Sequence, residues 1–287
     1  MSTLNNFKKF TDSLPIQGGK MPVLFTSHGN PMDIIKSREE RVFWNTLYDL
    51  GKELQNTFEI TAALVVSAHW CTNDQTLVNV SHTQQQIYDY YGFPKEYYDV
   101  IYNAKGAPDI AKEVVNLVSS AKETIDWGLD HGAWPMLMHL FPDGNVPVFQ
   151  MSINYNANPN YHYELGKQLK SLRKKGVLII GSGAFIHNIR LGMQKMMQKD
   201  TSLYGWEAEY DDWLKKQIEA RNFNELINYT TSHKYGILAA PTPDHYVPSL
   251  YSLGLMEKKD EISFFFEGEE SLTVPAFGER SFLIHQM

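Results

Sequence analysis

The sequence has almost no cysteine, no excess of positive charge and no long apolar run, and each absence excludes a class of protein. A single cysteine, Cys71, in 287 residues rules out an intrachain disulfide framework. The formal net charge of −7 argues against a nucleic-acid-binding surface, which needs clustered positive charge. The sequence contains no run of about 18 apolar residues that could span a membrane. We therefore expect a cytoplasmic protein that binds neither nucleic acid nor membrane.

The order of apolar and amphipathic segments predicts an α/β fold. Short apolar, β-branched runs are typical of buried strands and occur at 23–27, 62–68, 76–81, 146–153 and 176–182. Helical spacing of apolar residues predicts helices at 38–57, 107–123, about 160–174, and two between 203 and 230. The segment 261–286 alternates like antiparallel or edge strands. Together these patterns predict a single domain over 1–287, a three-layer α/β/α fold with a mixed central sheet.

Several familiar catalytic and binding motifs are also missing. There is no HExxH or CxxC pair, and the GSG at 181–183 belongs to neither a GxGxxG dinucleotide loop nor a GxSxG nucleophile elbow. What the chain has instead is a set of histidines that each follow an apolar run or lie in a turn bounded by glycine or proline. These are His28, His69, His131, His187 and His245.

These five histidines have settings that suit a metal site. Ligands of open α/β sheets gather at the carboxyl ends of the strands, and His28, His69 and His187 all follow predicted strands. Imidazole ligands suit zinc, copper, iron and nickel, and the lack of thiolates argues against a closed structural zinc site. Spacing alone leaves two interpretations open: a catalytic transition-metal site, or histidines that are merely turn residues.

The remaining histidines lack this setting. His139 lies in an apolar segment that resembles a buried helix, where a hydrogen-bonded core residue is expected. We interpret it as structural, together with His82, His162, His233 and His285.

Six segments that span nearly the whole chain carry a family resemblance. They are FTSHGNP (25–31), VVSAHW (65–70), IYDYYGFPKEYYDVIYNAKGAP (87–108), GLDHGAWPMLMHLFPDGNVPVFQMSIN (128–154), GVLIIGSGAFIHN (176–188) and PTPDHYVPSLYSLG (241–254). In this order they resemble the class III extradiol ring-cleaving dioxygenases, in the branch of the DOPA-extradiol dioxygenases. The helical stretch from about 190 to 235 carries none of the resemblance.

The resemblance implies a role for each of the five histidines. His28, His69 and His245 match the positions of the metal ligands. His187 matches the histidine beside the metal, as a fourth ligand or as an acid–base group, and His131 matches the histidine that faces substrate and oxygen. It also implies ferrous iron as the catalytic metal, with catechol and dioxygen as substrates. Zinc can fill the same site, because it binds nitrogen ligands more tightly than iron(II) does.

For the substrate, Trp70 and Tyr246 are aromatic residues beside site motifs that can wall a flat ring. Tyr91 and Phe93 are further candidates, although a core role suits them slightly better. Arg280, near a predicted strand, can bind a substrate carboxylate, and a surface ion pair explains it equally well.

Three functions are therefore compatible with the sequence. The first is an extradiol dioxygenase that opens a DOPA-like or related catechol to a semialdehyde. The second is a zinc hydrolase that uses a histidine-bound hydroxide. The third is a metal-stabilised binding module without catalysis.

Overall fold

The centre of the molecule is a mixed sheet with helices on both faces. In the computed structural model, which describes residues 19–286, eight strands form one sheet in the order β4-β3-β5-β2-β6-β1-β8-β7. The adjacent strands β5, β2, β6 and β1 run parallel to one another, whereas β8 and β7 join the β1 edge as antiparallel strands. At the other edge β3 is antiparallel to β5 and parallel to β4. The strands are β1 Val23–Thr26, β2 Ala62–Thr72, β3 Thr76–Asn79, β4 Ala121–Thr124, β5 Val148–Asn154, β6 Val177–Ser182, β7 Asp260–Phe266 and β8 Ser281–Gln286.

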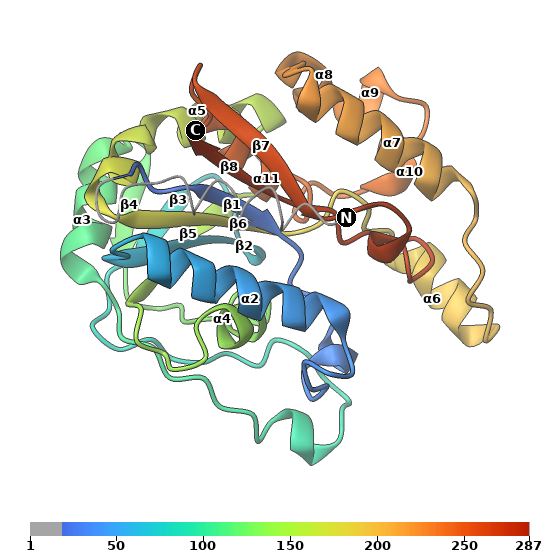
Figure 1. The fold of residues 1–287 in the computed structure, drawn as a ribbon, viewed down its shortest axis with the longest axis horizontal. Helices are drawn as coiled ribbons and strands as arrows, with labels where there is room; N and C mark the ends of the chain where they lie inside the picture. The colour runs from blue at the N-terminus through green and yellow to red at the C-terminus, as the bar shows by residue number, and fades with distance from the viewer. Residues whose placement is uncertain (1–18, 287) are drawn as a thin grey trace.

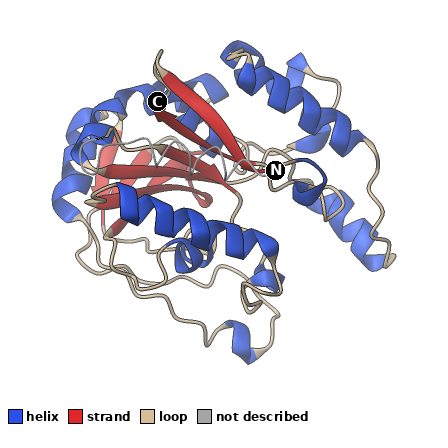
Figure 2. Ribbon diagram, viewed as in Figure 1, coloured by secondary structure: helices blue, strands red, loops and turns tan. Residues whose placement is uncertain are grey.

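Helices cover both faces of this sheet (Figures 1 and 2). On one face α2 and α4 pack against one apolar cluster, and on the other α3, α5, α7 and α11 pack against a second. The α-helices are α2 Val42–Thr57, α3 Pro108–Leu117, α4 Trp134–Leu140, α5 Pro159–Gln168, α6 Ile189–Met197, α7 Trp206–Glu219, α8 Phe223–Ile227, α9 Tyr229–Ser232, α10 Gly236–Ala239 and α11 Val247–Gly254. Short 3₁₀ turns add η1 Pro31–Asp33, η2 Lys95–Tyr97, η3 Lys170–Lys175 and η4 Gly268–Ser271.

Strand β1 shows how the sequence produces two buried faces. Val23 and Phe25 belong to one apolar cluster and Leu24 to the other, because successive side chains of a strand point to opposite faces. A strand covered on both sides buries side chains on both faces, so β1 shows no alternation of apolar and polar residues. The predicted three-layer α/β fold with a mixed sheet is therefore confirmed. The predicted domain range of 1–287 includes residues 1–18 and 287, which lie outside the described residues.

The structure differs from the sequence prediction at residues 107–123. The helix expected there ends at Leu117, because Val118 is extended, and residues 121–124 form β4 parallel to β3. The four residues of β4 are half-buried or exposed and only Ala121 is apolar, so no hydrophobic pattern marked this edge strand.

A close approach of β6 to the start of α11 brings His245 to the sheet edge. A Cβ atom at Gly183 would lie 2.2 Å from the carbonyl oxygen of His245, and one at Gly181 would lie 2.4 Å from that of Pro248. Both glycines therefore allow contacts that any side chain would prevent. The backbone N–H of Ala184 donates to the same His245 carbonyl, at 2.8 Å.

No helix within residues 19–286 is both long and apolar enough to cross a bilayer. The cytoplasmic location expected from the sequence stays a prediction.

Candidate metal centre

Five histidines from five separate segments line one cavity of about 780 Å³. His28 follows β1, His69 lies in β2, and His187 follows β6 at an isolated bridge with Phe277. His131 and His245 lie just ahead of α4 and α11. Because β1, β6 and β2 are parallel neighbours, their carboxyl ends meet at one edge, as the sequence predicted.

Three of these imidazoles face one another at nearly equal spacing. The ring centroids of His28 and His69 are 5.0 Å apart, those of His28 and His245 5.3 Å, and those of His69 and His245 5.0 Å. The Nε2 atoms of His28 and His69 are 3.2 Å apart. The Nε2 atom of His245 is buried and has no hydrogen-bond partner among residues 19–286.

The other nitrogen of each of these three rings has an oxygen partner. Nδ1 of His28 lies 3.0 Å from Oγ of Ser182, and Nδ1 of His69 lies 3.2 Å from Oδ2 of Asp89. Nδ1 of His245 is hydrogen-bonded to the carboxylate of Asp244. Outer partners of this kind orient metal-binding histidines and raise their basicity, so Nε2 remains for a shared ligand.

Asp89 also holds His131. Its Oδ2 lies 2.8 Å from Nδ1 of His131, and its Oδ1 accepts the backbone N–H of His131 at 2.8 Å. The ring of His131 is 3.7 Å from that of His69, centroid to centroid. Nitrogens of His28, His69 and His131 all lie within 4.8 Å of one another, as do ligand atoms of His187, Asp244 and His245. Asp89 was not singled out from the sequence, because it lies in a long irregular segment without a periodic pattern.

His187 lies flat against His245. Their ring centroids are 3.4 Å apart and their planes differ by 8°. The backbone N–H of His187 donates to the carbonyl of Ala239, at 2.8 Å, which fixes the segment between β6 and α6. His187 is therefore a cavity residue next to the three facing rings.

Burial favours the uncharged form of His28, His131, His187 and His245. Burial, with repulsion from neighbouring imidazoles, lowers the pKa of His28 and of His245 well below the usual histidine value. Burial also lowers the pKa of His187 to about 4, although Asp244 opposes the shift. The pKa of His131 is lowered by burial against the opposing effect of Asp89. Metal binding requires neutral imidazole, so the site presents its nitrogens in the form that binds.

The carboxylate of Asp89 supplies a negative charge beside His131 and His69. Burial alone would raise its pKa, but its contacts with His131 and His69 outweigh burial and lower it.

The three residues expected to bind substrate do not line this cavity. Trp70 is buried and stacks on Trp127, with centroids 5.9 Å apart. Tyr246 is buried against Tyr229, and its hydroxyl donates to a backbone carbonyl. The guanidinium of Arg280 is occupied by the carboxylates of Asp211 and Glu267. Of the two further aromatic candidates, Phe93 lines the cavity with Tyr90, whereas Tyr91 is 88% exposed and does not.

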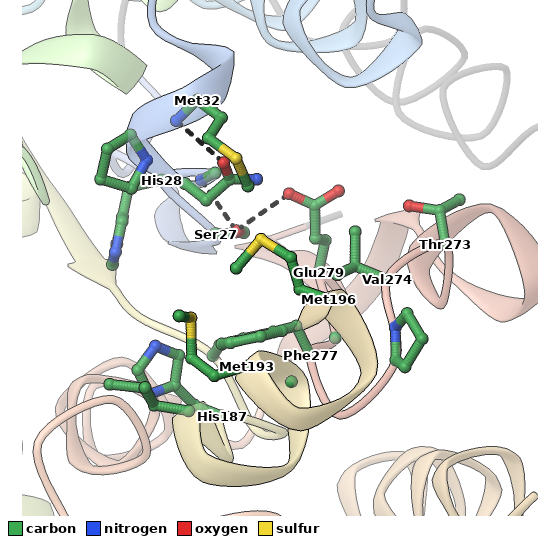
Figure 3. Close-up of a pocket in the computed structure, with 18 of the residues that line it drawn as sticks. Ser27, His28, Met32, His187, Met193, Met196, Thr273, Val274, Phe277 and Glu279 are labelled. Carbon is green, nitrogen blue, oxygen red and sulfur yellow. Dashed lines mark hydrogen bonds between the residues drawn. The ribbon is translucent and has the colours of Figure 1, made fainter. Parts of the chain in front are cut away.

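The neighbour of Arg280 faces the cavity instead. Glu279 forms an ion pair with Arg41, whose Nε lies 3.2 Å from Oδ2 of Asp33. The hydroxyl of Ser27, next to His28, donates to Glu279 at 3.3 Å (Figure 3). Glu279 and Arg280 are neighbours in the chain but bind different groups, Arg41 and Ser27 in one case and Asp211 and Glu267 in the other.

The donor set fits a transition-metal ion. Converging imidazoles with a carboxylate or a hydroxyl behind each ring suit iron or zinc, whereas magnesium or calcium would need oxygen ligands. The buried, unpartnered Nε2 of His245 beside two other imidazoles is the atom that such an ion would satisfy.

Known proteins resemble this chain in sequence and in fold. Residues 22–271 match the family described as the catalytic LigB subunit of aromatic ring-opening dioxygenase. The 4,5-DOPA dioxygenase extradiol of Escherichia coli K12 is 34% identical over 265 residues, which cover 90% of each chain. The protein of the same name from Beta vulgaris is 34% identical over 236 residues, 80% of this chain and 85% of that one.

Among solved structures, the chain resembles an uncharacterized protein from Escherichia coli K12 with a TM-score of 0.75. That likeness has 30% sequence identity and covers 92% of this chain and 99% of the other. The match over most of its length, and relatives above 30% identity, show that this chain belongs to the LigB family of class III extradiol dioxygenases.

Proposed function

We propose that this chain is an iron-dependent extradiol dioxygenase that opens a catechol ring to a semialdehyde. The observation that carries the proposal is the convergence of His28, His69 and His245, whose Nδ1 atoms are each held by an oxygen partner. Membership of a metal-dependent family of aromatic ring-opening dioxygenases gives that convergence its chemistry.

In this proposal His28, His69 and His245 would hold the ion through Nε2. A ferrous ion held by three protein groups supplies the place at which catechol oxygens and dioxygen meet. Imidazole ligands are uncharged, so they would leave the positive charge of the ion unbalanced. That charge would favour the deprotonated form of the catechol.

In this proposal His187 would act as the acid–base group and His131 would form a hydrogen bond with an oxygen of the substrate. His187 is uncharged at neutral pH and lies beside His245 in the cavity, so a ring nitrogen can accept the proton of a catechol hydroxyl. His131 has Nδ1 against Asp89, which orients the ring and leaves Nε2 for an oxygen of the substrate. Asp89 acts as a positioning residue for both His131 and His69.

The overall reaction balances without an added reductant. A ring carbon–carbon bond beside a hydroxyl-bearing carbon breaks, and both atoms of dioxygen enter the product. One oxygen atom ends in the new aldehyde and the other in the new carboxylate.

The test is reconstitution of the metal-free protein. Samples loaded anaerobically with iron(II) or zinc(II) are exposed to dioxygen and a panel of catechols that includes DOPA and protocatechuate. We expect catechol-dependent oxygen uptake of one equivalent, and a yellow product, with iron and not with zinc. Zinc found in a preparation would not by itself favour the zinc-hydrolase alternative, because zinc binds nitrogen ligands more tightly than iron(II) does. No oxygen uptake across the panel, with iron occupancy confirmed by mass spectrometry, would contradict the proposal.

A further inference from the structure

The cavity has a second half that the proposed chemistry does not use. Away from the histidines its wall is largely apolar and comes from two sides, with Met32 on one and Met193, Met196, Val274 and Phe277 on the other (Figure 3). Met32, Met193, Met196 and Val274 are 46%, 44%, 47% and 41% exposed. Single exposed apolar residues are ordinary, but several around one opening mark a binding surface.

This methionine wall is built onto the histidine site. Helix α6, which carries Met193 and Met196, begins two residues after His187, and Asn188 caps it by accepting the N–H of Leu191 at 3.0 Å. A Cβ atom at Gly192 would lie 2.1 Å from the ring of Phe277, so α6 packs closely against the lining segment that carries Phe277. A ligand that reaches His187 is therefore in position to touch these side chains.

The charged groups around this half of the cavity are largely paired. Nζ of Lys195 lies 2.6 Å from Asp200 and 2.9 Å from the hydroxyl of Ser202. Arg41 is paired with both Asp33 and Glu279, so its positive charge is already balanced. Lys199 lines the rim but is exposed.

Arg41 offers a competing anchor for a charged substrate. Its Nη1 is buried and has no hydrogen-bond partner within residues 19–286. A carboxylate on the substrate could take that position, although the two carboxylates on Arg41 would repel it.

We propose that the catechol opened by this chain carries an uncharged apolar arm that lies along Met32, Met193 and Met196. The inference rests on the proposed function for the ring end of the substrate. The cavity volume of about 780 Å³ is large for a bare ring and ordinary for a larger ligand. Methionine suits such a wall because its unbranched, polarizable side chain adapts to the shape of the arm.

The test compares 4-alkylcatechols from methyl to hexyl with DOPA and dihydroxyphenylpropionate. We expect kcat/KM of the iron-loaded protein to rise about threefold to fourfold per added methylene until the wall is covered. Calorimetric affinity of the zinc-loaded protein for the same series should rise by the same factor without any turnover.

Two neighbouring methionines provide a matched pair of variants. Met196→Glu places a charge in the wall, whereas Met197→Glu places it one residue further on the same helix turn, at a side chain that is 75% exposed and does not line the cavity. The dependence on chain length should flatten in Met196→Glu and in Met32→Glu, and should stay as in the wild type in Met197→Glu.

The two readouts separate the inference from the function. Affinity that rises with chain length, without ring opening, would support the apolar arm and contradict the dioxygenase proposal. Equal behaviour of Met196→Glu and Met197→Glu would overturn the inference. So would a preference for the carboxylate-bearing catechols that disappears in Arg41→Met.

Discussion

Two sets of histidines in this molecule differ in their surroundings: the five that line the cavity, and His139 and His162, which are buried in the core. His139 stacks on Trp44, with centroids 4.4 Å apart, and Nδ1 of His162 lies 3.0 Å from the hydroxyl of Tyr251. Burial lowers the pKa of both to about 4, the same value as for His187 in the cavity. Both also have a buried Nε2 that finds no hydrogen-bond partner among the described residues, as His245 has.

The difference is that the cavity histidines meet one another. His245 lies within 5.3 Å of His28, His69 and His187, centroid to centroid, whereas His139 and His162 each pack against an aromatic side chain of the core. A depressed pKa or an unpartnered nitrogen therefore does not identify a ligand in this chain. Convergence, with a carboxylate or hydroxyl on the second nitrogen, is the property that sets the candidate site apart.

The largest effect should come from exchanging one histidine of each set for alanine. His69→Ala should lose bound iron and more than about 100-fold in turnover, because even outer partners of metal ligands are worth about 10- to 100-fold. Its metal-free thermal unfolding should match the wild type, since His69 is partly exposed. His139→Ala should keep iron and turnover per folded molecule but lose on the order of 2 kcal/mol of stability. Elemental analysis, oxygen uptake and thermal unfolding measure these differences.

If His69→Ala retained full iron occupancy and turnover, the distinction between the two sets would collapse. Equal loss of iron in His139→Ala would have the same consequence.

The second effect separates a ligand from an acid–base group. His187→Gln should lower kcat by about 100-fold, at the lower end of what a positioned acid or base contributes. It should retain iron, because His187 stacks on His245 rather than joining the three facing rings. Iron loss as severe as in His69→Ala would instead make His187 a fourth ligand.

Sequence reasoning reached the sheet and the histidine cluster for a physical reason. Buried parallel strands are continuous apolar runs, and the residues that follow them share one edge of the sheet. Both properties can be read from short segments of sequence, so the sequence could predict that His28, His69 and His187 lie near one another. The edge strand β4, with no apolar pattern, could not.

The sequence did not predict most of the residues that line the cavity walls, because these walls are formed by contacts between residues far apart in the chain. The helix expected from residue 38 begins at Val42, which leaves Arg41 at its N-terminal boundary, where it pairs with Glu279, 238 residues away. No local pattern predicts such a pair. A contact of the same kind buries Arg280 against Asp211. Of the two roles that the sequence left open for Arg280, a substrate contact and an ion pair, the structure therefore shows an ion pair, and a buried one.

The third effect concerns the partners of Nδ1. Asp244→Asn should weaken iron binding by about 10- to 100-fold, because the amide no longer raises the basicity of His245. Ser182→Ala should cost less, since the hydroxyl on His28 carries no charge. Competition with a chelator gives both affinities, and Asp143→Asn, at an exposed loop residue, is the matched control. Equal affinity in Asp244→Asn and Asp143→Asn would show that the carboxylate on His245 is unimportant.

The smallest effect is a pH dependence that belongs to the structural set. Because burial holds the pKa of His162 at about 4, below its unfolded value near 6.5, the unfolded chain binds more protons between these pH values. The contribution of neutral His162 to stability is thus complete above pH 6.5 and is lost as pH falls toward 4. His162→Phe removes this titration, so the loss of stability between pH 7.5 and 5.5 should be about 1 kcal/mol smaller than in the wild type. Denaturant unfolding at the two pH values measures it, with exposed His82→Gln as control. Turnover at pH 7.5 should be unchanged, because His162 lies outside the cavity. An unaltered pH slope in His162→Phe would mean that this buried imidazole does not govern acid stability.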